Sequence, residues 1–387
     1  MKTKNEPSGP PMEEYEGSTM KILLISPLPP PPGGITTWTE KYVEWAKDHS
    51  ICAEVVNNAV IGGRATHLGS KREISSEIQR TRRILTELKR KISMCRPDAV
   101  HLNSPCGRFG IMRDYLCALA VKKKGIPVIV HFRCNIEDQI NNSRLSLYFF
   151  KKLAASANSI LVLNSPSKEF VLKHARRDSR QVANFIDDDY VIEQPKPISP
   201  EIRKVLFVGN VLESKGAKEI VSAASDFPGT EFILAGPVED KVSSLNAPGN
   251  VRLLRKQIPH EEIRDLLDEA DVFLFPSYTE GFSNAMLEAM ARGVPIIATG
   301  VGANADMIED SGGMLVRAGS VPDIVHSLRS ISPASVRERM SRWNVNKVRD
   351  AYLINRVMEC LIGIYDEVIN DERKYGKVHM DLVSNSL

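Results

Sequence analysis

Short apolar runs recur along the chain, and each ends at Gly, Pro or a polar residue. Lys21–Ser26 is the first, and Val272–Phe275 stops at Pro276. Runs of this length with such ends are typical of buried strands. Beyond these two, strands are expected at 98–102, 128–133, 159–165, 204–210, 231–236, 251–254, 294–298 and 312–316.

Between the runs, apolar residues recur every three or four positions, which predicts amphipathic helices. The alternation of strand and helix predicts doubly wound parallel sheets. The longest expected helix covers 71–95, and a last helical pattern runs from Val345 to about residue 370. Arginines and lysines crowd the 71–95 helix, and its apolar stripe consists of Ile74, Ile78, Leu85, Leu88 and Ile92.

The 387 residues suit two domains of ordinary size. Pro195, Pro197 and Pro200 mark a linker between them. We therefore expect a first domain over 20–195, a second over 196–345, and a terminal helix and tail over 346–387. Residues 1–19 are rich in Pro, Glu and Lys and lack an apolar core, so we expect a disordered tail rather than a signal peptide.

Composition narrows the class of protein. No apolar run approaches the ~20 residues that a membrane helix needs. The six cysteines form no Cys-x-x-Cys pair, which favours a reducing cytoplasm over a disulfide scaffold or a zinc site. Asp187–Asp189 stands in the linker without further ligands, so we expect no metal site there.

Charge is distributed unevenly. Residues 1–195 contain 29 Lys and Arg and 21 Asp and Glu, a net charge of +8, whereas the remainder has 22 and 27, a net charge of −5. The first half is therefore expected to face an anionic partner, such as a membrane surface. Nucleic acid is not expected, because no aromatic residues interleave the basic helix and no known motif is present.

The stretch from residue 272 to 298 reads as a strand, a loop, a helix and a second strand. Ser283 or Asn284 can cap the helix, which runs to about Arg292. This arrangement puts Glu280 at the carboxyl end of a strand, where open α/β sheets bind ligands, and Glu288 inside the helix. A helix N-terminus binds anions, and carboxylates accept hydrogen bonds from sugar hydroxyls, so the stretch predicts a ligand with both groups.

The same stretch resembles the Glu-x7-Glu signature of retaining glycosyltransferases of family four, which have the GT-B fold. The motif runs from Glu280-Gly281-Phe282 to Glu288-Ala289, with Gly293-Val294-Pro295 and Gly300-Val301-Gly302 behind it. The resemblance covers residue 20 to about 370. It implies two Rossmann-like domains facing across a cleft and a last helix that crosses back to the first domain. It also implies metal-independent transfer with retention, in which the departing phosphate serves as base.

The resemblance also implies roles for single residues. Glu280 would contact the hydroxyls of the transferred sugar, and Glu288 would hold those of the ribose. Lys215 matches the lysine of the family's Gly-Arg…Lys-Gly segment and would stabilise the leaving diphosphate. His131 would lie near the reaction centre. The remaining donor or acceptor contacts would come from Gly33, Gly34, Gly209, Asn210, Gly281, Phe282, Ser283 and Asn284.

Two positions depart from the family pattern. Asn210 stands where an arginine is usual, and an amide carries no charge. Another cation substitutes, for which Arg133 is a candidate, or the enzyme is slower, or activity has been lost. Phe185 stands where glycine is usual and weakens any role for Asn184. Phe282-Ser283-Asn284 differs from the mannosyltransferase pattern and favours a UDP-sugar over a GDP-sugar.

We therefore expect a retaining glycosyltransferase that moves a sugar from a nucleotide donor to a glycan or lipid-linked acceptor in cell-surface polysaccharide or glycoconjugate synthesis. It would work in the cytoplasm or at the inner face of the membrane, without a cofactor besides the donor. Two alternatives stay open: a sugar-nucleotide epimerase of the same fold, and a catalytically weakened nucleotide-sugar-binding protein.

Overall fold

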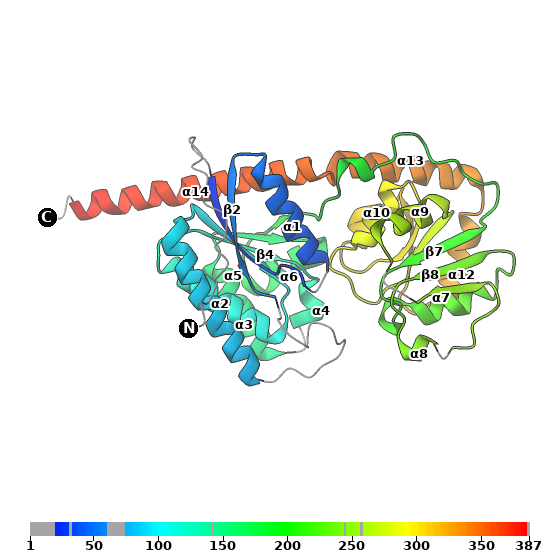
Figure 1. Ribbon diagram of the computed structural model, residues 1–387, viewed down its shortest axis with the longest axis horizontal. Helices are drawn as coiled ribbons and strands as arrows, with labels where there is room; N and C mark the ends of the chain where they lie inside the picture. The colour runs from blue at the N-terminus through cyan, green and yellow to red at the C-terminus, as the bar shows by residue number, and fades with distance from the viewer. Residues whose placement is uncertain are drawn as a thin grey trace, which may run out of the picture.

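The computed structural model describes residues 20–30, 33–59, 74–140, 143–243, 245–255 and 258–384, the last ten of them by their backbone only. The predicted tail 1–19 and the first three residues of the predicted 71–95 helix lie outside this part. Two α/β domains lie side by side, joined along one edge by two long helices (Figure 1). Each contains a six-stranded sheet in which every pairing is parallel.

The first sheet has the order β2-β1-β3-β4-β5-β6. The apolar runs predicted all of its longer strands except β2, whose polar and half-buried residues interrupt the pattern. The direction of winding reverses between β1 and β3, so the loops after these two strands diverge there. The strands are β1 (Met20–Ser26), β2 (Ile51–Asn57), β3 (Ala99–Ser104), β4 (Val128–Phe132), β5 (Ser159–Val162) and β6 (Arg180–Gln181).

Helices cover both faces of this sheet, and alternate strand residues serve the two faces. Leu23 and Ile25 face the layer of α2 to α6, while Ile22 and Leu24 face α1 and the C-terminal helix α14. The helices are α1 (Gly34–Lys47), α2 (Ile74–Cys95), α3 (Arg108–Lys122), α4 (Ile136–Ile140), α5 (Arg144–Ser156), α6 (Ser165–Ala175) and α14 (Ile354–Ser384).

The predicted apolar stripe of the long basic helix is only partly buried. Leu88 and Ile92 pack into the core together with Ile84, whereas Ile74 and Ile78 are 66% and 47% exposed. The N-terminal turns of α2 thus lie outside the core that the described residues form. The stripe was therefore predicted too long.

The second sheet has the order β12-β11-β10-β7-β8-β9, the arrangement of a dinucleotide-binding fold, and it reverses between β7 and β10. All six strands match predicted runs. Their bounds are β7 (Lys204–Val208), β8 (Glu231–Ala235), β9 (Val251–Leu254), β10 (Val272–Phe275), β11 (Ile296–Thr299) and β12 (Gly313–Val316). Its helices are α7 (Ala217–Ala224), α8 (Asp240–Ser243), α9 (His260–Glu269), α10 (Asn284–Ala291), α11 (Asn304–Ile308), α12 (Val321–Ser330) and α13 (Ala334–Ala351).

The chain passes between the domains twice, and the two crossings are hydrogen-bonded to each other. Ile186 N donates to Tyr352 O at 2.9 Å, and Ile354 N donates to Ile186 O at 2.9 Å. This pairing needs an extended backbone at Leu353. The single helix expected from Val345 onward is therefore two helices, α13 and α14, with the break between them. Beyond it, α14 lies along the first domain beside α1 (Figure 1), and its Leu361 and Tyr365 join the first domain's core.

Candidate functional site

The predicted site residues of the second domain converge on the switch point of its sheet. Lys215 belongs to a 3₁₀ turn (Glu213–Lys215) that follows β7, and Glu280 belongs to the loop that follows β10. Because β7 and β10 are neighbours, these two loops meet. The convergence places a cation, a carboxylate and the N-terminus of α10 at one edge of the sheet.

Lys215 and Glu280 form an ion pair. Lys215 Nζ lies 2.5 Å from Glu280 Oε1, and Ser277 Oγ donates to the same oxygen at 2.7 Å. Gly216 makes this approach possible: its φ is +76°, and a Cβ there would lie 2.3 Å from Pro276 O. The lysine is thus held against the end of β10, where Glu280 neutralises its charge.

The loop between Glu280 and α10 is pressed against the first domain. A Cβ on Gly281 would lie 3.0 Å from Cys134 Cα, and Asn164 Nδ2 donates to Gly281 O at 2.9 Å. Ser283 caps α10, as predicted, by accepting a hydrogen bond from Met286 N at 3.2 Å. Phe282 turns away and packs edge-on against Tyr352, with ring centroids 5.6 Å apart. Its backbone, rather than its ring, is therefore available to a ligand.

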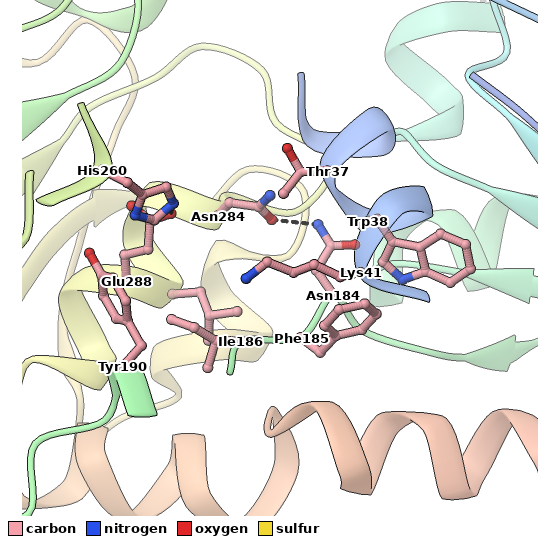
Figure 2. A pocket seen from close by; sticks show the side chains of 11 residues that line it. Thr37, Trp38, Lys41, Asn184, Phe185, Ile186, Tyr190, His260, Asn284 and Glu288 are labelled. Atoms are coloured by element: carbon pink, nitrogen blue, oxygen red, sulfur yellow. Dashed lines mark hydrogen bonds and ion pairs between the residues drawn. The ribbon is translucent and has the colours of Figure 1, made fainter. Parts of the chain in front are cut away.

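Glu288 lines a small cavity between the domains, together with Lys41, Tyr190 and His260 (Figure 2). Lys41 comes from α1 and Glu288 from α10, and their side chains point into the cavity from opposite sides (Figure 2). Burial raises the pKa of Glu288 to about 7, and Lys41 partly offsets this. His260 Nε2 is 3.5 Å from Glu288 Oε1, and Tyr190 OH has no hydrogen-bond partner among the described residues.

His131 does not reach this cavity. It is fully buried in β4, where its ring lies 5.4 Å from that of His101 and meets the edge of Trp38. Burial and the nearby guanidinium of Arg133 hold its pKa well below the usual range, so the ring is neutral. The structure thus gives His131 a packing role behind the site and no direct opening to a ligand.

Arg133 is a buried cation without a carboxylate partner among the described residues. Its guanidinium lies 4.5 Å from the centre of the Trp38 ring, and burial lowers its pKa to about 9. Nη2 donates to Asn184 Oδ1 at 2.6 Å, while Nε has no partner in the described part of the chain. A cation in such surroundings is costly and is usually retained for function.

Asn184 carries this contact across to the second domain. Its Nδ2 donates to Asn284 Oδ1 at 2.6 Å (Figure 2). Arg133, Asn184 and Asn284 therefore form a polar relay from β4 through the linker to the first residue of α10. The resemblance alone carries no firm role over to Asn184, because Phe185 breaks the family pattern. The structure has Phe185 packed beside Trp38, with ring centroids 5.9 Å apart, and leaves Asn184 in the site.

The remaining predicted residues lie around the same junction. Gly209 directly follows β7, and Asn210 after it is exposed, with no hydrogen bond from its side chain to any described residue. Gly33 caps α1, and a Cβ on Gly34 would lie 3.5 Å from Asn284 Nδ2. Lys41, Tyr190 and His260 were not predicted, because they come from separate elements and form no sequence motif.

Among the described residues, no three His, Cys, Asp or Glu side chains are grouped closely enough to hold a metal ion. No helix in the described ranges has both the length and the apolar character that a bilayer span requires.

Known proteins resemble this chain in sequence and in fold. Residues 202–332 match the family model described as glycosyl transferases group 1. TuaC of Bacillus subtilis, a glycosyltransferase provisionally assigned to teichuronic acid biosynthesis, is 24% identical over 245 residues. The match covers 60% of this chain and 60% of TuaC, so the chain spans less than two thirds of that relative.

Solved structures share the fold across nearly the whole chain. Sucrose-phosphate synthase of Thermosynechococcus elongatus superposes with a TM-score of 0.72 and 14% identity, covering 91% of this chain and all of that one. HepE of Anabaena, solved in complex with UDP and glucose, superposes with a TM-score of 0.64 and 14% identity, covering 90% of this chain and 99% of that one. At these identities the likeness establishes the two-domain GT-B architecture.

Proposed function

Since residues 202–332 belong to the glycosyl transferases group 1 family within a GT-B fold, we propose that this protein transfers a sugar, with retention and without a metal ion, from a nucleotide-diphosphate donor to a glycan or lipid-linked acceptor. A UDP-sugar is the favoured donor, and the product would enter a cell-surface polysaccharide or glycoconjugate. TuaC is named for such a pathway, and HepE was solved with UDP and glucose, which supports the choice.

The observation that carries the proposal is the convergence of Lys215, Glu280 and Glu288 around the N-terminus of α10. Glu288 accepts hydrogen bonds from the ribose hydroxyls, and Glu280 accepts them from the sugar. Lys215 and the first N–H groups of α10 face the diphosphate, which gains negative charge as the anomeric bond breaks. Ser277 holds Glu280 in place through the 2.7 Å hydrogen bond.

The cation that is usual at position 210 has two candidate replacements in the first domain. Lys41 lines the cavity at Glu288, and its Nζ is paired with Asp187 of the linker, a carboxylate that it would have to leave for a phosphate. Arg133 is buried and reaches the donor loop only through Asn184 and Asn284. We assign Lys41 the direct contact with the nucleotide and Arg133 the positioning of α10. Both come from the first domain, so the full positive charge is assembled only when the domains are closed.

Donor entry requires the domains to separate. The cavity at Glu288 has a volume of only about 40 Å³, room for about one water molecule at liquid density. A nucleoside is many times larger. We therefore infer that the donor binds as the relay from Arg133 through Asn184 to Asn284 opens.

The acceptor side of the proposal includes a membrane surface. α2 and α3 form a groove lined by Lys89, Lys123, Lys124 and Leu116, and Met94 nearby is 67% exposed. Basic residues near an anionic bilayer contribute about 1 kcal/mol each, and salt screens them. Exposed apolar side chains beside them favour reversible, peripheral binding to the inner face of the membrane.

The function is tested by incubating the pure protein with labelled UDP- and GDP-sugars and following binding, hydrolysis and product. Tight binding of a UDP-sugar with slow release of free sugar that keeps its anomeric configuration supports the proposal. Conversion to an epimeric nucleotide sugar without acceptor would identify the epimerase. Binding without any turnover would identify a weakened binding protein, and no binding of any nucleotide sugar would refute the assignment.

Membrane binding is tested by co-sedimentation with vesicles. Binding should rise with the fraction of anionic lipid and vanish near 0.5 M salt, since screening is then strong. Equal and negligible binding to neutral and anionic vesicles at low salt would point instead to a soluble acceptor.

A further inference from the structure

A second and larger cavity lies in the first domain, at the point where its sheet reverses. Its volume is about 500 Å³, and it is bounded by the loops that follow β1 and β3. Ligands of open α/β sheets bind at such switch points. The cavity therefore has the position of a binding site, separate from the loops that carry Lys215 and Glu280.

Two helices point their N-termini at this cavity. α1 begins after Gly33 and α3 begins after Gly107; both glycines line the cavity, and neither helix has a side-chain cap. The first helical hydrogen bonds are Thr37 N to Gly33 O and Ile111 N to Gly107 O. The N–H groups of residues 34–36 and 108–110 thus have no hydrogen-bond acceptor among the described residues. Uncapped N–H groups at a helix N-terminus attract anions.

An independent observation concerns Asn58. This side chain is 97% buried, since its exposure is 3%, and it lines the cavity. Its Nδ2 has no hydrogen-bond partner in the described part of the chain. An unpaired buried donor is costly unless a ligand accepts from it.

Among the described residues that line the cavity, the two charged ones are both arginines. Arg80 of α2 is largely buried and donates to the carbonyl oxygen of Asn58, and Arg113 of α3 is 3% exposed. Their carboxylate partners, Glu77 and Asp114, are not among the described lining residues. The cavity thus presents cationic and N–H donors to its interior while the balancing negative charges lie outside its wall.

The cavity also adjoins the donor site. Gly34 lines it, and a Cβ on Gly34 would lie 3.5 Å from Asn284 Nδ2 at the start of α10. A molecule seated here would lie next to the loop assigned to the transferred sugar. We propose that this cavity binds a phosphate group carried by the acceptor substrate. That an acceptor carries this phosphate rests on the proposed function, whereas the phosphate site itself does not.

The site is tested on the full-length protein saturated with UDP, so that the donor's own phosphate subsite is occupied. Calorimetry should detect saturable, equimolar binding of inorganic phosphate. Arg80→Gln and Asn58→Ala should each weaken this binding at least tenfold. Arg90→Gln is the matched control, because Arg90 lies on the same helix, is exposed and, among the described residues, hydrogen-bonds to Met94 on the same helix; it should leave binding unchanged.

The two sources of the phosphate are separated with glycerol 3-phosphate and with phosphatidylcholine vesicles that contain phosphatidic acid. Tighter, Arg80-dependent binding to the vesicles assigns a lipid phosphate, and tighter binding of glycerol 3-phosphate assigns a soluble one. Absence of phosphate binding to folded wild-type protein, or binding that neither Arg80→Gln nor Asn58→Ala weakens, overturns the proposal. If Arg80→Gln does not fold, Asn58→Ala decides. If the protein binds phosphate but not UDP, the proposed function is refuted and the phosphate site is still supported.

Discussion

Replacing Glu280 by Gln should tighten the binding of UDP. In the unliganded protein Glu280 neutralises Lys215, and the lysine must leave this partner before it can face a diphosphate. UDP carries no sugar for Glu280 to bind, so the carboxylate only opposes it. Glutamine keeps the shape and the hydrogen bond from Ser277 but removes the charge.

The magnitude follows from the geometry of the pair. The two side chains are 27% and 11% exposed and lie in direct contact, so solvent screens them only in part. Hydrogen bonds to charged groups contribute about 1.5–3 kcal/mol, and partial exposure reduces this to about 1–2 kcal/mol. Each 1.4 kcal/mol is a factor of ten, so UDP should bind about five- to thirtyfold more tightly.

The assay is calorimetric titration of wild type and Glu280→Gln with UDP and with the UDP-sugar. Glu219→Gln is the matched control, since Glu219 is a nearby carboxylate that accepts from Tyr278 OH and does not pair with Lys215. The tightening should be confined to UDP, while sugar transfer falls because the sugar hydroxyls lose an acceptor. Unchanged or weaker UDP binding in the folded variant would refute the reasoning that the ion pair opposes diphosphate binding.

The remaining predictions concern the same junction. Glu288→Ala should weaken UDP binding by about 1–3 kcal/mol by leaving ribose hydroxyls unpaired. The affinity of the wild-type protein for UDP should rise from pH 6 to 8, because the Glu288 carboxyl, with a pKa of about 7, accepts hydrogen bonds best once it is ionised. A flat pH profile in calorimetry would contradict this. Lys215→Ala should lower kcat more than donor affinity, and wild-type kcat would remove it from the site; Asn210→Arg should raise kcat if charge is limiting. Arg133→Met should raise the free energy of unfolding by about 1 kcal/mol, since it removes an uncompensated buried cation. The same variant should have a lower kcat/KM, because the hydrogen bond to Asn184 is lost. Denaturant titration checks the first effect and steady-state kinetics on the same sample check the second.

Much of the fold was predictable because it depends on local patterns. The apolar runs and their Pro or Gly ends located every strand of the second sheet, and Ser283 marked the start of α10. β2 was not predicted from the sequence, because it is an edge strand with few buried positions. The helix break at Leu353 was not predicted either, because it depends on pairing with Ile186, which is far away in the sequence.

The site was predictable where a motif is continuous and not where it is assembled from distant segments. Lys215, Glu280 and Glu288 follow known spacings, and the structure brings them to one sheet edge. Lys41 and Tyr190 line the same cavity but come from a helix of the other domain and from the linker. His131 shares a strand end with Arg133, and no sequence pattern tells which of the two faces the site.

The route of α14 has a consequence for synthesis on the ribosome. The first domain's core is closed on one face by Leu361, Ile364 and Tyr365, which pack against Trp38 and Tyr42 from the other end of the chain. When residue 200 leaves the ribosome, α1 is already available to pack on that face, but the part that α14 covers is still open, and it stays so until the whole second domain has been made. Domains fold as they emerge, so the second domain is expected to complete its core before the first. The nascent first domain would meanwhile expose apolar surface, so it is the part of the chain to which chaperones are expected to bind.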